Sequence, residues 1–205
     1  MAAIHAVHHK VIGSRQLAVT YRDRISVRVV VFNATGEVAL MRCAKEDYYK
    51  LPGGGVEPGE DQATAAQREL LEETGCLIRL RDGGCFATTE EFRRHNHQVS
   101  FCYRADLVED TGRLDLTEEE LEDELTCCWM PAVEARRVMD AAVPTSEFGR
   151  FVRERDLWVL DRAVEDQSGV VMDITSKAGK ATDSLGNSRG NNEIKDAGAE
   201  SNSQV

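Results

Sequence analysis

A glycine-rich turn followed by an acidic helix constrains this chain more than any other feature. Residues 53–76 read GGGVEPGEDQATAAQRELLEETGC. An α-helix advances about 100° per residue, so the carboxylates of Glu69, Glu72 and Glu73 fall within an arc of about 100° on one face. Like charges at this spacing destabilise a helix, and Arg68 can pair with only part of the charge. Because oxygen ligands suit Mg²⁺ or Mn²⁺, the pattern predicts a site for a divalent cation.

The same segment carries a family resemblance. Five residues separate Gly54 from Glu60, and seven more lead to the run RELLEETGC, which begins at Arg68. This spacing is similar to the Nudix box, G-x5-E-x7-R-E-U-x-E-E-x-G-U, in which U is a bulky aliphatic residue. Every charged and glycine position of the box is present. Cys76 stands at the final aliphatic position, and cysteine behaves as a small hydrophobe.

The resemblance implies a role for each residue of the box. Glu69, Glu72 and Glu73 would be metal ligands, and a backbone carbonyl near Gly53 would join them. Arg68 would orient one of these carboxylates through a bidentate contact. Arg68 and the three glutamates are therefore candidates for the catalytic site, and Gly53 is a candidate metal ligand.

The glycines and Glu60 are expected to form the loop that approaches the ligand. Gly53, Gly54 and Gly55 let the backbone turn sharply without interference from a Cβ atom. Glu60 would brace this loop or reach a metal ion through water. These four residues are the candidates for cofactor binding.

The base that takes a proton from water is expected outside the box. In many members of the family this base is a glutamate shortly before the last core strand. Glu122 and Glu124 lie seven and five residues before Trp129, with residues 118–120 behind them. We take Glu124 as the candidate catalytic base, and the alternative is that the whole acidic run is a solvated loop.

The implied reaction is hydrolysis of a phosphoanhydride bond in a nucleoside diphosphate-linked compound. Metal ions neutralise charge on the phosphate oxygens and lower the pKa of the attacking water. Such chemistry needs positioning more than covalent catalysis, which suits a site of carboxylates without a Ser or Cys nucleophile. The segment Tyr49–Gly55 also resembles housecleaning members that act on oxidised nucleoside triphosphates. ADP-ribose, dinucleoside polyphosphates and inositol pyrophosphates stay open as substrates.

A catalytically silent Nudix-fold domain that binds or senses nucleotides is the alternative function. Such proteins typically lack one or more glutamates of the box, and none is missing here. A scaffold whose working part is the C-terminal tail has no motif to support it.

The strand and helix patterns predict a mixed α/β (α+β) fold. Their order is not the strict alternation of a doubly wound sheet. The resemblance implies a Nudix-like α/β/α sandwich with a mixed β-sheet. Strands are expected at 25–32, 37–42, 77–80, 85–89, 99–107 and 125–130, helices between Asp61 and Gly75, at 132–142 and from 145 or 146 to 164, and a polar loop at 90–96.

Length and composition predict one domain with two flanking segments. Residues 1–20 would be a frayed lead-in or an edge strand, and residues 21–165 the Nudix domain. Residues 166–205 are rich in Ser, Gly, Asn, Asp and Lys, so a low-complexity, disordered tail is expected.

The charge balance restricts the partners of the chain. It has 25 Lys and Arg against 36 Asp and Glu, a net charge of −11. This disfavours binding to a nucleic acid polymer, but it leaves small nucleotide diphosphates open because a bound cation reverses the local sign of a site. Members of the family often dimerise, so a homodimer is one expectation.

The cysteines and the apolar runs predict a cytoplasmic protein. None of the six cysteines forms a CxxC pair, as expected for reduced thiols. No apolar run approaches 18 residues, so no membrane is expected as a partner.

Overall fold

The computed structural model describes residues 8–81 and 84–182, with side chains described as far as residue 165. Strands and helices follow one another in a mixed order. Along the chain they are β1 (His8–Gly13), β2 (Arg22–Phe32), β3 (Glu37–Cys43), β4 (Tyr48–Lys50), α1 (Gln62–Thr74), β5 (Cys76–Leu80), β6 (Ala87–Arg93), β7 (Asn96–Asp110), α2 (Glu118–Glu122), β8 (Leu125–Pro131), α3 (Ala132–Ala141) and α4 (Glu147–Thr182).

The strands of the described residues form one mixed sheet of eight. β1 pairs with β6 and β2 pairs with β7 in parallel, whereas the other pairs are antiparallel. The longest register joins β2 to β7, from Arg22 opposite Asn96 to Phe32 opposite Asp106. The β-branched residues of β2 favour this extended, buried strand. The predicted mixed sheet is confirmed.

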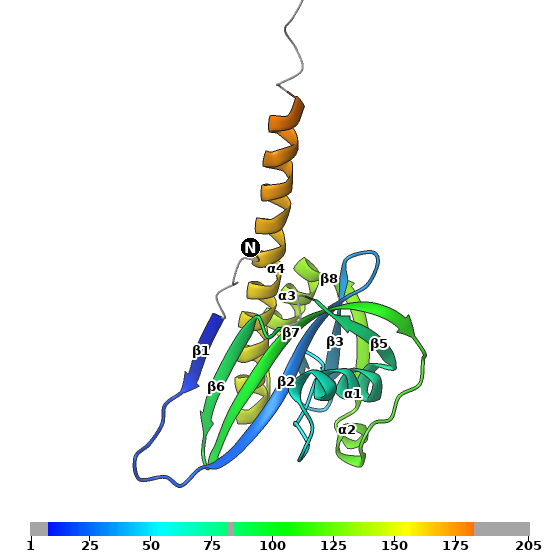
Figure 1. Cartoon of the computed structure of the whole chain (residues 1–205). Coiled ribbons are helices and arrows are strands. Elements are labelled where there is room, and N and C mark those ends of the chain that lie inside the picture. Colours follow the sequence, from blue (N-terminus) through cyan, green and yellow to red (C-terminus); the bar gives the residue numbers. More distant parts are fainter. Residues whose placement is uncertain (1–7, 82–83, 183–205) are drawn as a thin grey trace, which may run out of the picture. The chain divides into compact units, whose positions relative to one another are not determined.

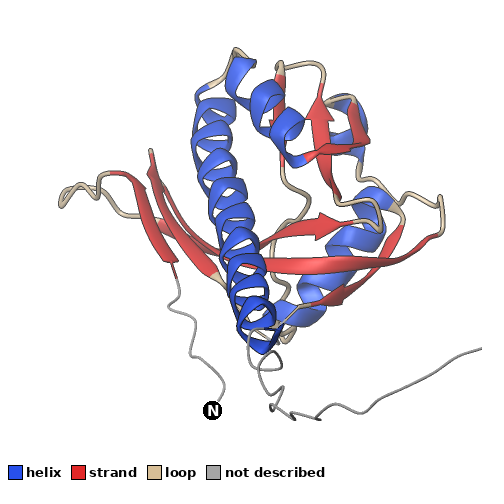
Figure 2. Cartoon of the chain, turned by 90° about the horizontal axis from the view of Figure 1, so that it is seen from above, coloured by secondary structure: helices blue, strands red, loops and turns tan. Residues whose placement is uncertain are grey.

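Helices cover both faces of the sheet, as the predicted sandwich requires. Neighbouring residues of β2 point to opposite faces. Val29 packs in one cluster with Leu70 of α1, and Val30 packs in another with Met139 of α3 and Leu160 of α4. Figure 1 shows α1 in front of the sheet and α4 behind it, and in Figure 2 α4 runs across the strands.

Helix α1 begins and ends at the predicted residues. Asp61 accepts a hydrogen bond from the backbone N–H of Thr64, and Gly75 closes the helix in the left-handed conformation at φ 70°. Helical spacing from Leu70 back to Ala66 and Ala63 would put all three on the core face, but Ala63 is exposed. The helix is rotated so that acidic side chains share its buried face. That face carries Ala65, Ala66, Glu69, Leu70, Glu73 and Thr74.

Two polar segments are more regular than the sequence indicated. The prediction of a polar loop at 90–96 is wrong, because β6 continues to Arg93 and β7 begins at Asn96. Along β6 buried residues alternate with half-buried ones, so its polar side chains belong to one face of a strand. The acidic run contains α2, which Thr117 and Glu120 start with a reciprocal capping box.

The structure describes part of each segment that flanks the predicted domain. β1 is an edge strand, one of the two expectations for residues 1–20, and residues 1–7 lie outside the described residues. α4 continues to Thr182, beyond the predicted domain boundary at 165. Residues 183–205 lie outside the described residues, so a disordered tail stays a prediction. No helix in the described ranges is long and apolar enough to cross a membrane.

The contacts of His97, near the start of β7, predict that the stability of the fold depends on pH. His97 Nδ1 lies 2.7 Å from Asp23 Oδ1, and its Nε2 lies 2.8 Å from Glu90 Oε1. These carboxylates raise the pKa of His97 above its usual 6.5, led by the hydrogen bond to Asp23. The stabilisation is therefore complete below pH 6.5 and is lost as the pH rises through the raised pKa.

Replacing His97 by glutamine should lower the free energy of unfolding by about 1 kcal/mol at pH 5.5, and by less at pH 9. Urea denaturation at the two pH values measures the difference. His95→Gln, at an exposed position of the same hairpin, is the control and should show no such trend. An equal loss at both pH values would mean that the charge of His97 does not contribute.

Candidate active site

The glycine turn, residues 53–55, lies against β2 so closely that a side chain at Gly53 or Gly54 would clash with neighbouring atoms. Gly53 has φ 131°, and a Cβ there would lie 2.4 Å from the carbonyl oxygen of Val27. A Cβ on Gly54 would lie 2.4 Å from Oε2 of Glu69. The N–H of Gly53 donates to Oε2 of Glu73 at 2.7 Å. The turn therefore brings backbone into direct contact with the helix carboxylates.

Arg68 ties the helix and the turn into one unit. Its Nε and one terminal nitrogen donate to the two oxygens of Glu60, both at 3.0 Å. The other terminal nitrogen donates to Glu69 at 3.0 Å and to Glu72 at 2.9 Å. The terminal nitrogen that contacts Glu60 also donates to the carbonyl oxygen of Gly55, at 2.9 Å. The predicted bidentate contact of Arg68 is thus made to Glu60, and single contacts orient Glu69 and Glu72.

The charges around Arg68 shift one another's pKa. Its hydrogen bond to Glu60 raises the pKa of Arg68 and lowers the pKa of Glu60. Glu60 also accepts a hydrogen bond from the N–H of Glu57 at 3.1 Å. This contact is consistent with the first of its two expected roles, which is to brace the turn.

Glu69 and Glu73 lie in the interior, where a negative charge is costly. Burial and then the charge of Glu73 raise the pKa of Glu69. Burial also raises the pKa of Glu73, which is 1% exposed, although Lys50 acts in the opposite direction. Lys50 Nζ lies 2.6 Å from Oε1 of Glu73. A bound cation would favour the charged form of Glu69, which is the less compensated of the two.

The residues present fit a hard cation through two carboxylates. Within the described residues, no three His, Cys, Asp or Glu side chains are grouped to hold one metal ion. Glu69 Oε2 and Glu72 Oε1, however, accept no hydrogen bond from the described part of the chain. Mg²⁺ usually takes one or two carboxylates together with waters and substrate phosphates. Both oxygens of Glu73 are already bound, by Lys50 and Gly53.

A cavity of about 710 Å³ opens onto these carboxylates. The glycine turn and α1 form one wall, and residues of α2 form another. Glu120 of α2 lines this cavity, whereas Glu124 is exposed and does not line it. Glu120 lies in contact with Glu73. Burial acts to raise the pKa of Glu120, but hydrogen bonds from Thr117 lower it on balance.

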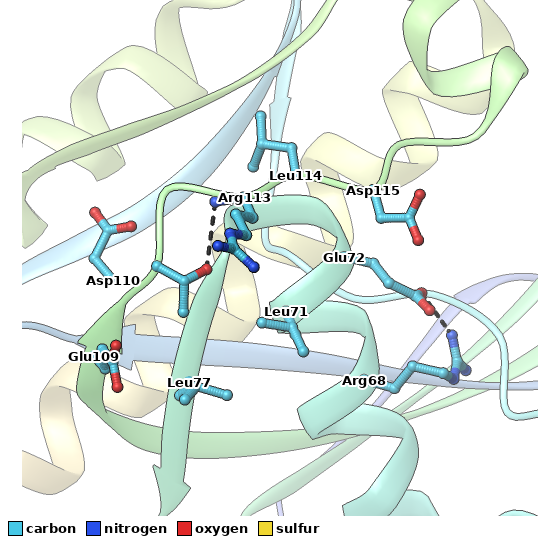
Figure 3. Close-up of a pocket in the computed structure, with 10 residues that line it drawn as sticks. Arg68, Leu71, Glu72, Leu77, Glu109, Asp110, Arg113, Leu114 and Asp115 are labelled. Carbon is cyan, nitrogen blue, oxygen red and sulfur yellow. Dashed lines mark hydrogen bonds and ion pairs between the residues drawn. The ribbon is translucent and has the colours of Figure 1, made fainter.

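A second cavity of about 750 Å³ lies on the outer side of α1. Figure 3 shows Leu71 and Glu72 of α1 facing Leu77 of β5 and the loop that carries Asp115. The N–H of Asp115 donates to the carbonyl of Glu72 at 2.8 Å. Arg68, Glu72 and Asp115 border both cavities, so the Glu72 side chain is reached from two sides.

Several cavity residues escaped the sequence analysis. Lys50 is a strand residue with no local sign of its contact to Glu73, and Asp115 follows a turn. Arg28 did leave a signal, because it interrupts the apolar run of β2. Glu120 did not escape, because residues 118–120 stood behind Glu122 and Glu124 as candidates for the base, and the capping pattern with Thr117 marks it as an ordered residue.

Comparison with known proteins places this site in a family. The NUDIX domain model matches residues 22–148, more than half of the chain. An RNA pyrophosphohydrolase from Cronobacter sakazakii is 35% identical over 72 residues, 35% of this chain and 40% of that protein. An RNA pyrophosphohydrolase from Bartonella henselae is 44% identical over 61 residues, 25% of this chain and 35% of that protein. The match thus spans about two fifths or less of these relatives.

Solved structures share the fold at low sequence identity. The E. coli ORF135 protein has a TM-score of 0.52 and 18% identity, covering 73% of this chain and 94% of that one. A C. elegans Ap4A hydrolase has a TM-score of 0.50 and 19% identity, covering 71% of this chain and 98% of that one. The match of the domain model over more than half of the chain, together with the complete box around Arg68, shows that the chain belongs to the Nudix family.

Proposed function

We propose that the chain hydrolyses a phosphoanhydride bond in a nucleoside diphosphate-linked compound, with the help of bound Mg²⁺ or Mn²⁺. The observation that carries the proposal is the Arg68 network, which holds Glu69 and Glu72 while one oxygen of each accepts no hydrogen bond from the described residues. Both side chains line the cavity of about 710 Å³. The name of the two curated relatives, RNA pyrophosphohydrolase, supports the same reaction class.

Glu69 and Glu72 would hold the cation, together with the carbonyl oxygen of Gly53. The carbonyls of the neighbouring residues 52 and 54 accept hydrogen bonds from β2, whereas that of Gly53 accepts none in the described part of the chain. When bound, the cation neutralises charge on the phosphate oxygens and lowers the pKa of the attacking water. Arg68 keeps the two carboxylates in place.

Other residues of the cavity would position the substrate and accept the proton. Lys50 neutralises Glu73, which reduces the repulsion between this carboxylate and an incoming phosphate. Glu120 faces the same space from α2 and would serve as the base, in the role first assigned to Glu124. Positioning and charge neutralisation are the main requirements of phosphoryl transfer.

A silent nucleotide-binding domain is the second candidate function. It is favoured by the occupation of both Glu73 oxygens by Lys50 and by the N–H of Gly53. In a domain without catalysis, such contacts could replace the cation altogether. The intact box favours the enzyme instead.

Purified protein incubated with Mg²⁺ and a panel of nucleotide diphosphate compounds tests the proposal. Phosphate or nucleotide release should require the metal and stop on addition of a chelator. Glu72→Gln should lower kcat/KM by about 10- to 100-fold. Loss of a residue that only hydrogen-bonds to a metal ligand has an effect of this size, and loss of a ligand should cost at least as much. Glu134→Gln, a half-buried position of α3 that is paired with Arg137 and lines neither cavity described above, is the control and should keep full activity.

Two results would count against the proposal. Turnover that is indifferent to Glu72→Gln would remove this residue from the metal site. Nucleotide binding without turnover of any compound by the intact protein would favour the silent domain.

A further inference from the structure

Part of the cavity lining beside the carboxylates is basic, although the chain carries a net charge of −11. Arg24 and Arg28 are four residues apart on β2, so their side chains leave the same face of the strand. Both line the cavity that contains Glu69 and Glu73. The charge of Arg28 also acts to lower the pKa of each of these glutamates, which places it beside the proposed metal site.

The guanidinium of Arg28 is buried with part of its hydrogen-bonding capacity unused. The residue is 6% exposed, and one terminal nitrogen donates to the carbonyl of Val27 at 2.6 Å. Its Nε has no hydrogen-bond partner among the residues that the structure describes. Burial, followed by the charge of Arg155, lowers the pKa of Arg28. A buried positive charge with an unpaired donor is unfavourable, and an anionic ligand would offset that charge by accepting from the part of the guanidinium that lines the cavity.

The acidic groups near Arg28 are already bound to other partners. Arg155 donates to Asp156 at 2.6 Å and to Glu91 at 3.1 Å. Glu73 is held by Lys50. Arg28 therefore faces the cavity with a charge that no carboxylate of the described residues claims through a hydrogen bond.

The basic part of the lining continues away from the carboxylates. A smaller cavity of about 170 Å³ shares Arg24, Gln98 and Phe148 with the first. It adds Arg22 and Arg93, so further cations follow Arg24 along this side. The parallel register of β2 and β7 places Arg24 opposite Gln98, which fixes the order of these side chains.

We propose that Arg28 and Arg24 bind a phosphate group of the substrate that lies next to the cleaved linkage. The substrate would then carry at least three consecutive phosphates, as in a nucleoside triphosphate or a dinucleoside polyphosphate, rather than a diphosphate bridging two sugars. This inference rests on the proposed hydrolysis. The cation held by Glu69 and Glu72 serves the two phosphates at the scissile bond, and the guanidinium of Arg28 binds the oxygens of the third.

Steady-state kinetics with two substrates tests this assignment. Arg28→Gln should raise the KM for a nucleoside triphosphate by about 10- to 100-fold, since one charge-assisted contact is lost. Its kcat, and both constants for ADP-ribose, should change by less than about threefold. Arg28→Lys, which keeps the charge without the planar fork, should recover part of the KM. Arg136→Gln, an exposed position of α3 paired with Asp161, is the control.

Calorimetric titration with inorganic tripolyphosphate separates this inference from the proposed function. The wild-type protein should bind it at least about tenfold more tightly than Arg28→Gln, whether or not any nucleotide is hydrolysed. If Arg28→Gln does not fold, Arg24→Gln at an exposed position carries the same test, with the same direction of change. Equal losses for both substrates, or an unchanged affinity for tripolyphosphate, would overturn the phosphate subsite. If no nucleotide is hydrolysed but tripolyphosphate binding still depends on Arg28, only the proposed hydrolysis is overturned and the phosphate subsite stands.

Discussion

Arg155→Met is expected to lower the free energy of unfolding by about 3–5 kcal/mol. Arg155 is 0% exposed and forms ion pairs with Asp156 at 2.6 Å and Glu91 at 3.1 Å. Methionine fills much of the same space, so the cavity left behind is small. The cost arises because two buried carboxylates lose their counter-charge. Urea denaturation followed by circular dichroism at pH 7 measures the change.

Arg162→Met is the matched control for this loss. It lies on the same helix, and its partner Glu165 is 58% exposed at the side chain. A surface pair contributes about 0–1 kcal/mol, so the control should remain close to the wild type. Asp156→Asn in the Arg155→Met background should recover part of the stability. Equal losses for the two arginines would show that the buried pairs do not carry the effect.

The Arg155 network also connects the helix behind the sheet to the candidate site. Oδ2 of Asp156 accepts a hydrogen bond from the N–H of Leu51 at 2.8 Å. Leu51 comes two residues before Gly53, whose N–H binds Glu73. We therefore expect a loosened network to move the glycine turn, and reduced activity in Arg155→Met would follow from this link rather than from contact with the substrate.

The parts of the site that the sequence predicted are local in the chain. The helix between Asp61 and Gly75, the sharp turn at Gly53 and the carboxylates beside Arg68 all follow from spacings within one short segment. Helical periodicity and the conformational freedom of glycine are sufficient to infer them. The family pattern added roles to these residues, and their geometry is consistent with most of those roles.

The parts that the sequence did not predict depend on distant pairs. Lys50 and Glu73 are 23 positions apart, Glu91 and Arg155 are 64 apart, and Leu51 and Asp156 are 105 apart. No local pattern indicates such contacts, because they depend on strand order and on the path of α4. The same reason explains why polar residues of β6 were read as a loop. Their partners lie on other strands and on a helix far along the chain.

In the acidic run before β8, the position of the short helix α2 determines which glutamate is the better candidate for the catalytic base. Spacing from Trp129 favoured Glu124, but α2 ends at Glu122 and leaves Glu124 exposed at φ 54°. Glu120 instead lines the cavity, and its Oε2 accepts a hydrogen bond from the N–H of Thr117 at 2.9 Å. A carboxylate fixed by a helix cap is held in one position, which proton transfer requires.

Glu120→Gln is accordingly expected to lower kcat by about 10²- to 10⁴-fold, the usual contribution of a positioned base. Glutamine retains an oxygen for the hydrogen bond from Thr117, so the cap and the fold should survive, and KM should change little. Glu124→Gln is the matched control on the same segment and should keep kcat within about twofold. Steady-state kinetics of the two variants at saturating Mg²⁺ measures the contrast, with thermal denaturation as the check on folding. A large loss in Glu124→Gln with an active Glu120→Gln would return the base to Glu124, and it would require α2 to rearrange when substrate binds.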